Sequence, residues 1–304
     1  MRKSIGVGLM LSMVLAVAGC EGPGPASTKL QVSVSIPPQA YFVRRIGGDK
    51  VEVHVVVPPY LDPHEYDPTP AQLARLTRSR LYVKTGLAEF TFEPRLIDPT
   101  LAAHPDMHVV DMSKGIRLRR IGEDEVPLAG TAVDADTQAG ARDPHIWTDP
   151  ANARIIVRNI YEGLVAVEPA SQAYFQTNLN SLLADIDAVD AEIEKTLADY
   201  RGGYFMDYHP AWGCFAQAYG LHQVCIEVEG KEPGPKDLQR VIDLGREKRI
   251  KVIFVQKGFD RRSAQVVADA IGAKVVEIDP MAEDWLTNMK TVADTFKRAL
   301  AKES

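Results

Sequence analysis

Three of the seven histidines share a local context that suits metal binding. Each has an aspartate two residues before it and a proline directly beside it, and they are His64, His145 and His209. Proline fixes the backbone φ angle, so an imidazole beside it is held at low entropic cost. A neighbouring carboxylate could also take the second ring N–H of a ligating histidine, which the spacing by itself does not show. The pattern therefore indicates imidazole ligands for a transition metal ion, although each histidine taken alone could be a turn residue.

Asp279 is a fourth candidate ligand, because it follows an expected strand and precedes Pro280. In open α/β sheets, ligands bind outside the carboxyl ends of the strands. Three imidazoles and one carboxylate suit Zn²⁺, which is usually four-coordinate and accepts nitrogen and oxygen donors. A helix cap or turn former is the alternative for Asp279. The other histidines are interpreted as structural or surface residues, and they are His54, His104, His108 and His222.

The stretches around these residues alternate between strand and helix patterns. Strands are expected at 30–35, 51–57, 81–84, 108–111, 204–206, 224–228, 251–255 and 274–278. Helices are expected at 39–46, 71–79, 150–167, 212–219, 235–249, 260–271 and 284–300. This alternation predicts an α/β fold with mostly parallel sheets flanked by helices.

The strongest helical pattern in the chain covers residues 171–200. Apolar residues recur there at three- and four-residue steps, with no Gly or Pro between them. Thirty residues would form a rod of roughly 45 Å. A coiled coil is the alternative, but the short repeat and its α/β flanks favour a strut within one molecule. We therefore expect an N-terminal lobe (30–170), a rigid linking helix (171–200) and a C-terminal lobe (201–304), with the metal site in the cleft between the lobes.

The first twenty residues predict export and lipid attachment. A short basic head precedes an apolar stretch at 5–19, which is too short for a membrane span of about 20 residues and suits a secretory signal. Small residues just before Cys20 resemble the lipobox of bacterial lipoproteins, in which the cysteine is cut free and acylated. We expect a signal peptide at 1–19 and a lipidated Cys20 that begins a flexible tether at 20–29. Plain cleavage and an uncleaved anchor are the alternatives.

The composition is that of an ordinary globular protein. The 304 residues include 35 Lys and Arg against 41 Asp and Glu, so the formal net charge of −6 argues against a nucleic-acid partner. Hydrophobic residues make up 45%, which excludes a disordered chain. Besides Cys20 there are Cys214 and Cys225, which form either a disulfide or two free thiols.

Taken together, these motifs resemble the solute-binding lipoproteins of metal-ion ABC importers, a zinc- and manganese-binding family with two lobes joined by a long helix. The resemblance runs from about residue 30 to the C-terminus, and its matching stretches are 62–68, 143–150, His209 with 219–221, 226–233 and 278–280. In that family each of four motifs supplies one metal ligand, which implies His64, His145, His209 and Asp279. A histidine at the third position resembles the zinc-type members, whereas a glutamate there is typical of the manganese type.

The resemblance implies a non-catalytic, monomeric receptor that captures Zn²⁺ outside the cytoplasmic membrane and delivers it to an ABC transporter permease. It would be periplasmic or on the cell surface, anchored through Cys20. Zinc-type members often carry a His-rich loop before the second motif, but residues 122–142 are acidic and contain no histidine. This departure argues against a secondary zinc site there, and a role for Glu65 at the primary site stays open.

Other functions remain as alternatives. A receptor of the same family for Mn²⁺ or Fe²⁺ is the nearest. A secreted zinc hydrolase is the competing class, but the His-Glu-x-x-His and Gly-x-Ser-x-Gly patterns are absent. A fourth protein ligand would also fill the position that a catalytic water needs. An adhesin is the third, because the same fold could carry that function.

Overall fold

The computed structural model describes residues 29–121, 142–227, 232–258 and 261–301. The expected signal peptide, the expected lipidation site Cys20 and the acidic loop up to residue 141 lie outside these ranges. Within them, no helix has the length and apolar character needed to cross a membrane.

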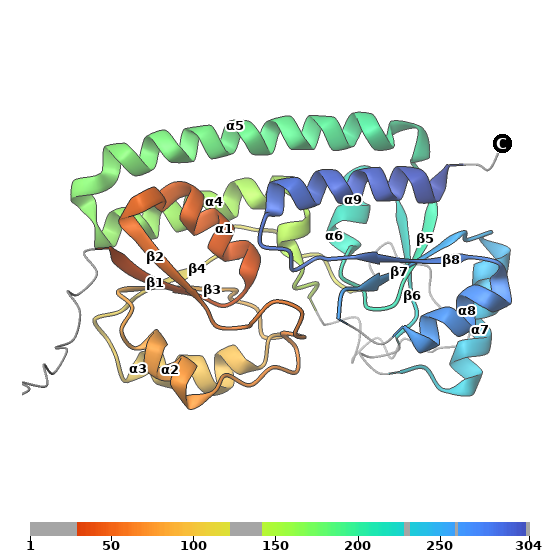
Figure 1. Ribbon diagram of the computed structural model, residues 1–304, viewed down its shortest axis with the longest axis horizontal. Helices are drawn as coiled ribbons and strands as arrows, with labels where there is room; N and C mark the ends of the chain where they lie inside the picture. Colours follow the sequence, from red (N-terminus) through yellow and green to blue (C-terminus); the bar gives the residue numbers. More distant parts are fainter. Residues whose placement is uncertain (1–28, 122–141, 228–231, 259–260, 302–304) are drawn as a thin grey trace, which may run out of the picture.

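The N-terminal lobe is built on a parallel sheet with the strand order β2-β1-β3-β4. Its strands are β1 (Leu30–Val34), β2 (Val51–Val55), β3 (Leu81–Lys84) and β4 (His108–Asp111). Helices α1 (Pro37–Gly47) and α4 (Pro150–Val167) cover one face, and α2 (Pro70–Leu76) and α3 (Asp98–Ala102) lie on the other side (Figure 1). Because all the strands run in parallel, their carboxyl ends share one edge of the sheet.

The C-terminal lobe repeats this plan with the strand order β6-β5-β7-β8, again all parallel. Its strands are β5 (Tyr204–Asp207), β6 (His222–Cys225), β7 (Val252–Gln256) and β8 (Lys274–Ile278). Its helices are α6 (Gly213–Tyr219), α7 (Pro235–Glu247), α8 (Arg262–Ile271) and α9 (Trp285–Leu300).

Apolar side chains of successive strand residues cover both faces of the second sheet. Phe205 and Phe254 point to one face, where their rings lie 4.8 Å and 4.5 Å from that of Phe296 in α9. Met206 and Ile253 point to the other face and join the core beneath α7 and α8. Successive residues of a strand face opposite ways, so a sheet covered on both sides needs nearly continuous apolar strands.

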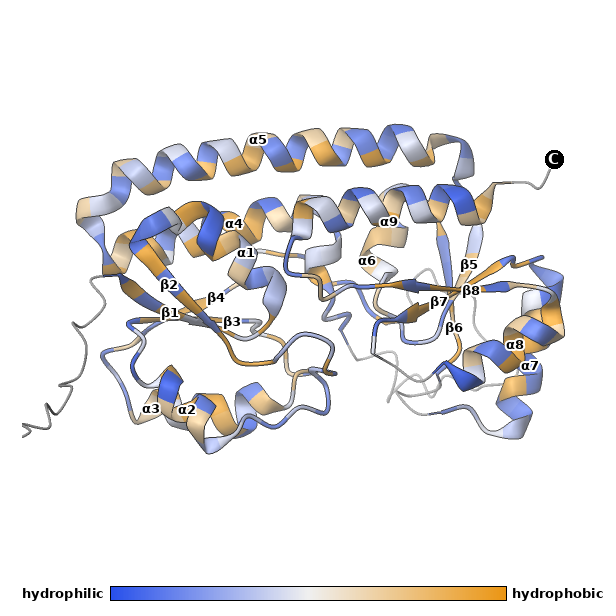
Figure 2. Cartoon of the chain, viewed as in Figure 1, coloured by the Kyte–Doolittle hydropathy of each residue, from blue (hydrophilic) through white to orange (hydrophobic). Residues whose placement is uncertain are grey.

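The long helix α5 (Gln172–Leu197) connects the two lobes. Short 3₁₀ turns, Pro169–Ser171 and Ala198–Tyr200, extend it at both ends. Its apolar stripe, visible along the helix in Figure 2, is buried against α1 and α4 of the first lobe and α9 of the second. The stripe is therefore covered within one chain, which confirms the strut and not the coiled coil.

A chain of buried aromatic contacts also joins the lobes. The Trp285 ring at the start of α9 lies 5.4 Å from the Phe42 ring of α1. Trp285 donates its Nε1–H to the Trp147 carbonyl, and Trp147 donates its own to the Pro280 carbonyl, both at 2.7 Å. Both indoles are about 99% buried, so the two lobes share one apolar core beside the junction.

The order of the elements agrees with the sequence-based prediction, with two differences. Strand β6 begins at His222, two residues earlier than expected, so His222 belongs to the sheet. Residues 93–102 form helical turns, Glu93–Ile97 followed by α3, where no element was expected. Pro94 and Pro99 interrupt the apolar period there, which hides the helical pattern.

Cys214 and Cys225 are not joined by a disulfide in the structure, so the alternative of two thiols holds. Cys214 is buried in α6, and Cys225 at the end of β6 donates its S–H to the Tyr208 carbonyl at 3.4 Å.

Candidate metal centre

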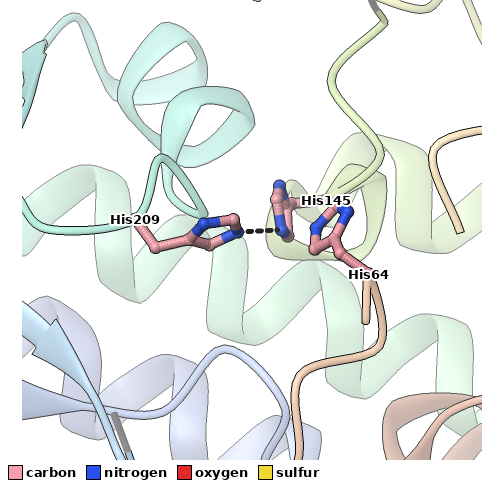
Figure 3. A group of neighbouring side chains, drawn as sticks. All are labelled: His64, His145 and His209. Atoms are coloured by element: carbon pink, nitrogen blue, oxygen red, sulfur yellow. Dashed lines mark hydrogen bonds between the residues drawn. The ribbon is translucent and has the colours of Figure 1, made fainter. Parts of the chain in front are cut away.

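His64, His145 and His209 meet where the two lobes join (Figure 3). His64 lies in the loop after β2, His145 directly precedes the 3₁₀ turn Ile146–Thr148, and His209 follows β5. One ring nitrogen of each lies within 4.8 Å of those of the other two. The ring centroids are 5.1, 5.2 and 5.5 Å apart. Among the described residues, this is the one cluster of His, Cys, Asp or Glu with the geometry of a metal site.

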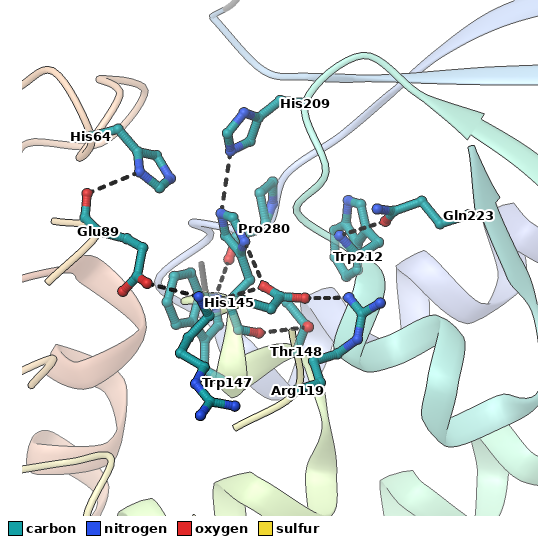
Figure 4. Close-up of polar contacts among 12 residues, drawn as sticks. His64, Glu89, Arg119, His145, Trp147, Thr148, His209, Trp212, Gln223 and Pro280 are labelled. Atoms are coloured by element: carbon teal, nitrogen blue, oxygen red, sulfur yellow. Dashed lines mark hydrogen bonds and ion pairs between the residues drawn. The ribbon is translucent and has the colours of Figure 1, made fainter. Parts of the chain in front are cut away.

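A buried ion pair orients His145 (Figure 4). Asp143 accepts both the backbone N–H and the Nδ1–H of His145 at 3.0 Å, and its other oxygen lies 2.6 Å from Arg119 Nη1. Burial alone would raise the pKa of Asp143, but hydrogen bonds and charge from His145 and Arg119 hold it well below its usual range. The aspartate is therefore ionised. Burial also lowers the pKa of His145, which favours the neutral ring with its proton on Nδ1.

His209 is oriented by a carboxylate that is distant in the sequence. Its Nδ1 lies 2.9 Å from Glu227 Oε2, and both side chains are nearly buried, at 12% and 11% exposed. The pairing follows from strand register, because Asp207 of β5 lies opposite Cys225 of β6. The Glu227 N–H also bonds to the Tyr208 carbonyl at 3.1 Å, so the ladder continues into both loops. Residues two positions beyond the paired strand ends therefore meet.

A backbone carbonyl orients His64. Its Nδ1 lies 3.3 Å from the Glu89 carbonyl oxygen, and its backbone N–H donates to Asp62 at 2.9 Å. Burial lowers the pKa of His64 well below its usual value, and the neighbouring His209 and His145 lower it further. This ring is therefore neutral at physiological pH, with a nitrogen available for a metal.

Buried Glu93 holds the loop that supports His64. Its carboxylate accepts the backbone N–H groups of Thr85 and Gly86 at 2.6 Å and 3.0 Å. This fixes the turn after β3, which carries Phe90, and the Phe90 ring lies 4.8 Å from the His64 ring. An apolar wall therefore stands beside the imidazoles. Glu93 and Phe90 could not be identified from the sequence, because their contribution depends on contacts between separate elements.

The inward-facing nitrogens carry lone pairs that repel one another, and a bound cation would relieve this repulsion. Because Asp143 and Glu227 accept the Nδ1 protons of His145 and His209, the Nε2 atoms of these two rings carry lone pairs. The two Nε2 atoms lie 3.3 Å apart, and a hydrogen bond between them would require one ring to be an imidazolium. His64 Nε2 is buried without a hydrogen-bond partner. Three converging imidazole lone pairs fit a borderline metal ion such as Zn²⁺.

Asp279 does not belong to this cluster in the structure. Its carboxylate accepts the Met281 backbone N–H at 2.9 Å, in the manner of a turn residue, and burial raises its pKa. Asp279 directly follows β8 of the second lobe. The carbonyl of the neighbouring Pro280 accepts the Trp147 Nε1–H, so Asp279 lies beside the junction between the lobes. Its role as a ligand stays a prediction. Glu65 is exposed and also lies outside the cluster.

The remaining histidines lie outside the cluster as well. His54 bonds to Gln31 at 2.9 Å, and His104 bonds to the Thr100 carbonyl at 2.8 Å. His222 stacks on Tyr204 at 4.7 Å, and His108 is exposed on β4. Their surroundings are those of structural or surface residues.

Known metal-transport proteins match this chain over most of its length. A relative from Bacillus subtilis, a high-affinity zinc uptake system protein ZnuA, is 28% identical over 90% of this chain and 87% of its own. A manganese ABC transporter substrate-binding lipoprotein, PsaA from Streptococcus anginosus, is 25% identical over 97% of both. A crystal structure of ZnuA superimposes with a TM-score of 0.80 and 34% identity, over 90% of this chain and all of that one. The family model for the periplasmic zinc-uptake complex component A matches residues 32–299, and the chain belongs to that family.

Proposed function

We propose, on the premise of this family membership, that the protein is a zinc receptor of an ABC importer, binding Zn²⁺ outside the cytoplasmic membrane and delivering it to the permease. The observation that carries the proposal is the set of three imidazoles whose inner nitrogens converge within 4.8 Å. In this role the protein is not an enzyme, because capture and release make or break no covalent bond in the cargo.

The donor atoms favour zinc over manganese. Imidazole nitrogen suits Zn²⁺, whereas Mn²⁺ prefers carboxylate, carbonyl and water oxygens. Relatives named for zinc and for manganese both match this chain, so the donor set of this chain has to decide the metal. His209 is the informative position, because a third imidazole there makes the site rich in nitrogen. Mn²⁺ or Fe²⁺ is the alternative cargo.

Asp279 is proposed as the fourth ligand. It follows β8, whose carboxyl end lies at the same edge of the second sheet as His209 and Glu227. A carboxylate from the second lobe would join His209 there, while His64 and His145 come from the first lobe. An ion bound by both lobes would be released when they separate slightly. The shared aromatic core and the strut α5 would limit that motion to small shifts.

We further propose that the receptor is held at a membrane through Cys20. Cys20 would carry a lipid anchor after removal of residues 1–19, and the tether would leave the lobes free to reach a permease. The protein would act as a periplasmic or cell-surface monomer. Replacing Cys20 with Ser should release the protein from membranes in cell fractionation while leaving metal binding intact. A variant that has lost residues 1–19 and still stays membrane-bound would contradict the lipid anchor.

Competitive metal titration tests the proposed cargo. The metal-stripped protein, produced without residues 1–26, is titrated with Zn²⁺, Mn²⁺ and Fe²⁺ against a calibrated chelator. We expect one tight equivalent of Zn²⁺ and much weaker Mn²⁺ binding. Most nitrogen and oxygen sites prefer zinc to manganese, so the size of the gap is the informative quantity. Comparable affinities would favour the manganese receptor, and no binding of any of the three ions would refute the site.

A further inference from the structure

The three imidazoles are supported by acceptors of different charge. His64 donates to a neutral backbone carbonyl, that of Glu89. His145 donates to Asp143, whose charge is balanced by Arg119 at 2.6 Å. His209 donates to Glu227, and in the described part of the chain no lysine or arginine is within ion-pair distance of that carboxylate. Within the described residues, His209 is therefore the one of these three rings whose acceptor is a carboxylate with no basic partner.

We propose that Glu227 is a positioning residue for His209, which keeps the proton on Nδ1 and strengthens Nε2 as a metal donor through its charge. This inference rests on the proposed function and concerns the same site. A carboxylate behind a ligating imidazole fixes its tautomer and raises its basicity. The effect is large at this position because both side chains are nearly buried, and charges interact more strongly where water is excluded.

The charge balance of the site supports this role. Three neutral imidazoles contribute no charge, and the Arg119–Asp143 pair sums to zero. Zn²⁺ bound by these rings and by the carboxylate of Asp279 would leave one positive charge. The carboxylate of Glu227 balances that charge through a single imidazole. Glu227 therefore adds a negative charge behind one of the rings that would hold the dication.

The backbone holds Glu227 in place independently of the metal. The residue follows β6, and its N–H is bonded to the Tyr208 carbonyl one residue before His209. The Glu227 and His209 side chains are thus brought together by the backbone pairing that continues beyond β5 and β6. Their contact should be present in the metal-free protein, which makes it measurable without zinc.

Two substitutions separate orientation from charge. Glu227→Gln keeps an oxygen that accepts the Nδ1 proton but removes the charge, and Glu227→Ala removes both. Glu232→Gln is the matched control, because Glu232 is an exposed glutamate five residues along that bonds to Ser263 and not to a ligand. Thermal unfolding of each metal-free variant verifies that the fold is retained.

The test combines nitrogen NMR of the His209 ring in metal-free protein with competitive Zn²⁺ titration. We expect the Nδ1–H tautomer in the wild type and in Glu227→Gln, and a mixture of tautomers in Glu227→Ala. Zinc affinity should fall about tenfold in Glu227→Gln and about 10- to 100-fold in Glu227→Ala, with no change in Glu232→Gln.

The possible failures are distinguishable. Wild-type protein with the proton on Nε2 of His209, or unchanged zinc affinity in Glu227→Ala, would overturn the inference about Glu227. Equal affinity of Glu227→Gln and wild type would overturn the contribution of charge. A wild type that binds no zinc at all would instead refute the proposed function, and the tautomer measurement would still report on the Glu227 contact.

Discussion

Replacing His209 with Ala should weaken zinc binding without unfolding the protein. His209 contributes one of the three converging nitrogens, and its side chain is 12% exposed at the lobe junction. The substitution removes a hydrogen bond to Glu227 but also separates two lone pairs that face each other at 3.3 Å. These effects oppose each other, so we expect the metal-free unfolding free energy to change by only about 1 kcal/mol.

The size of the loss follows from the number of ligands. Zinc bound by four protein ligands is held with an apparent free energy of about 10–16 kcal/mol, so one ligand accounts for about 2.5–4 kcal/mol. At about 1.4 kcal/mol per factor of ten, the affinity of the variant should fall by roughly 60- to 700-fold. The zinc-dependent increase in stability should shrink by the same free energy.

Competitive titration against a chelator measures the affinity, and chemical denaturation with and without zinc measures the linked stability. His222→Ala is the matched control, because His222 lies on the neighbouring strand and stacks on Tyr204 outside the cluster. Wild-type affinity in the His209 variant would remove this residue from the site. A large loss in the His222 variant would show that the wrong histidines were assigned.

Three further substitutions test the structure around the site. In Gly213→Ala the added Cβ would overlap Arg119 and lie 2.6 Å from Asp143 Oδ2, so denaturation should show a loss of about 1–3 kcal/mol and titration weaker zinc binding. Burial raises the pKa of Glu93 above its value in the unfolded chain, so the folded state holds this proton more tightly and the associated stability is lost as pH rises through the folded-state pKa. Denaturation between pH 4 and 8 should therefore show the wild type losing stability relative to Glu93→Gln as pH rises. Trp285→Phe leaves the buried Trp147 carbonyl without its donor and should cost about 1–3 kcal/mol in chemical denaturation.

Each of these predictions has a clear contrary result. Gly234→Ala is the control for Gly213, because its nearest neighbour would be Asp237 Oδ2 at an ordinary 3.6 Å, and equal stability of the two variants would contradict the close approach. A stability difference between Glu93→Gln and wild type that is constant with pH would show that Glu93 has no raised pKa. Full stability in Trp285→Phe would show that its hydrogen bond does not hold the lobes together.

The helices and strands of this fold can be predicted from the sequence because the spacing of apolar residues within each element indicates its type. The apolar stripe of α5 is readable from its helical period, and the structure buries it against helices of both lobes. The three histidines were identified from their shared Asp and Pro neighbours, and the structure brings those three together. Where a strand begins is less predictable, as at His222, because pairing with β5 decides it.

The supports of the histidines could not be predicted in the same way. An aspartate two residues earlier could accept the ring N–H, and Asp143 does so for His145. Glu227 and the Glu89 carbonyl reach their rings from other loops, 18 and 25 residues away. Strand register would have found Glu227, since β5 and β6 run in parallel with Asp207 opposite Cys225. That register is set by the pairing of β5 with β6 in the folded sheet and cannot be derived from the sequence alone.

X-ray absorption of the zinc-loaded protein tests the central claim most directly, because it counts the ligands of the ion itself. We predict three imidazole nitrogens and one carboxylate oxygen at about 2.0–2.2 Å, with one imidazole lost in His209→Ala. Sulfur at about 2.3 Å, or fewer than three imidazoles in the wild type, would contradict the site assembled from His64, His145 and His209.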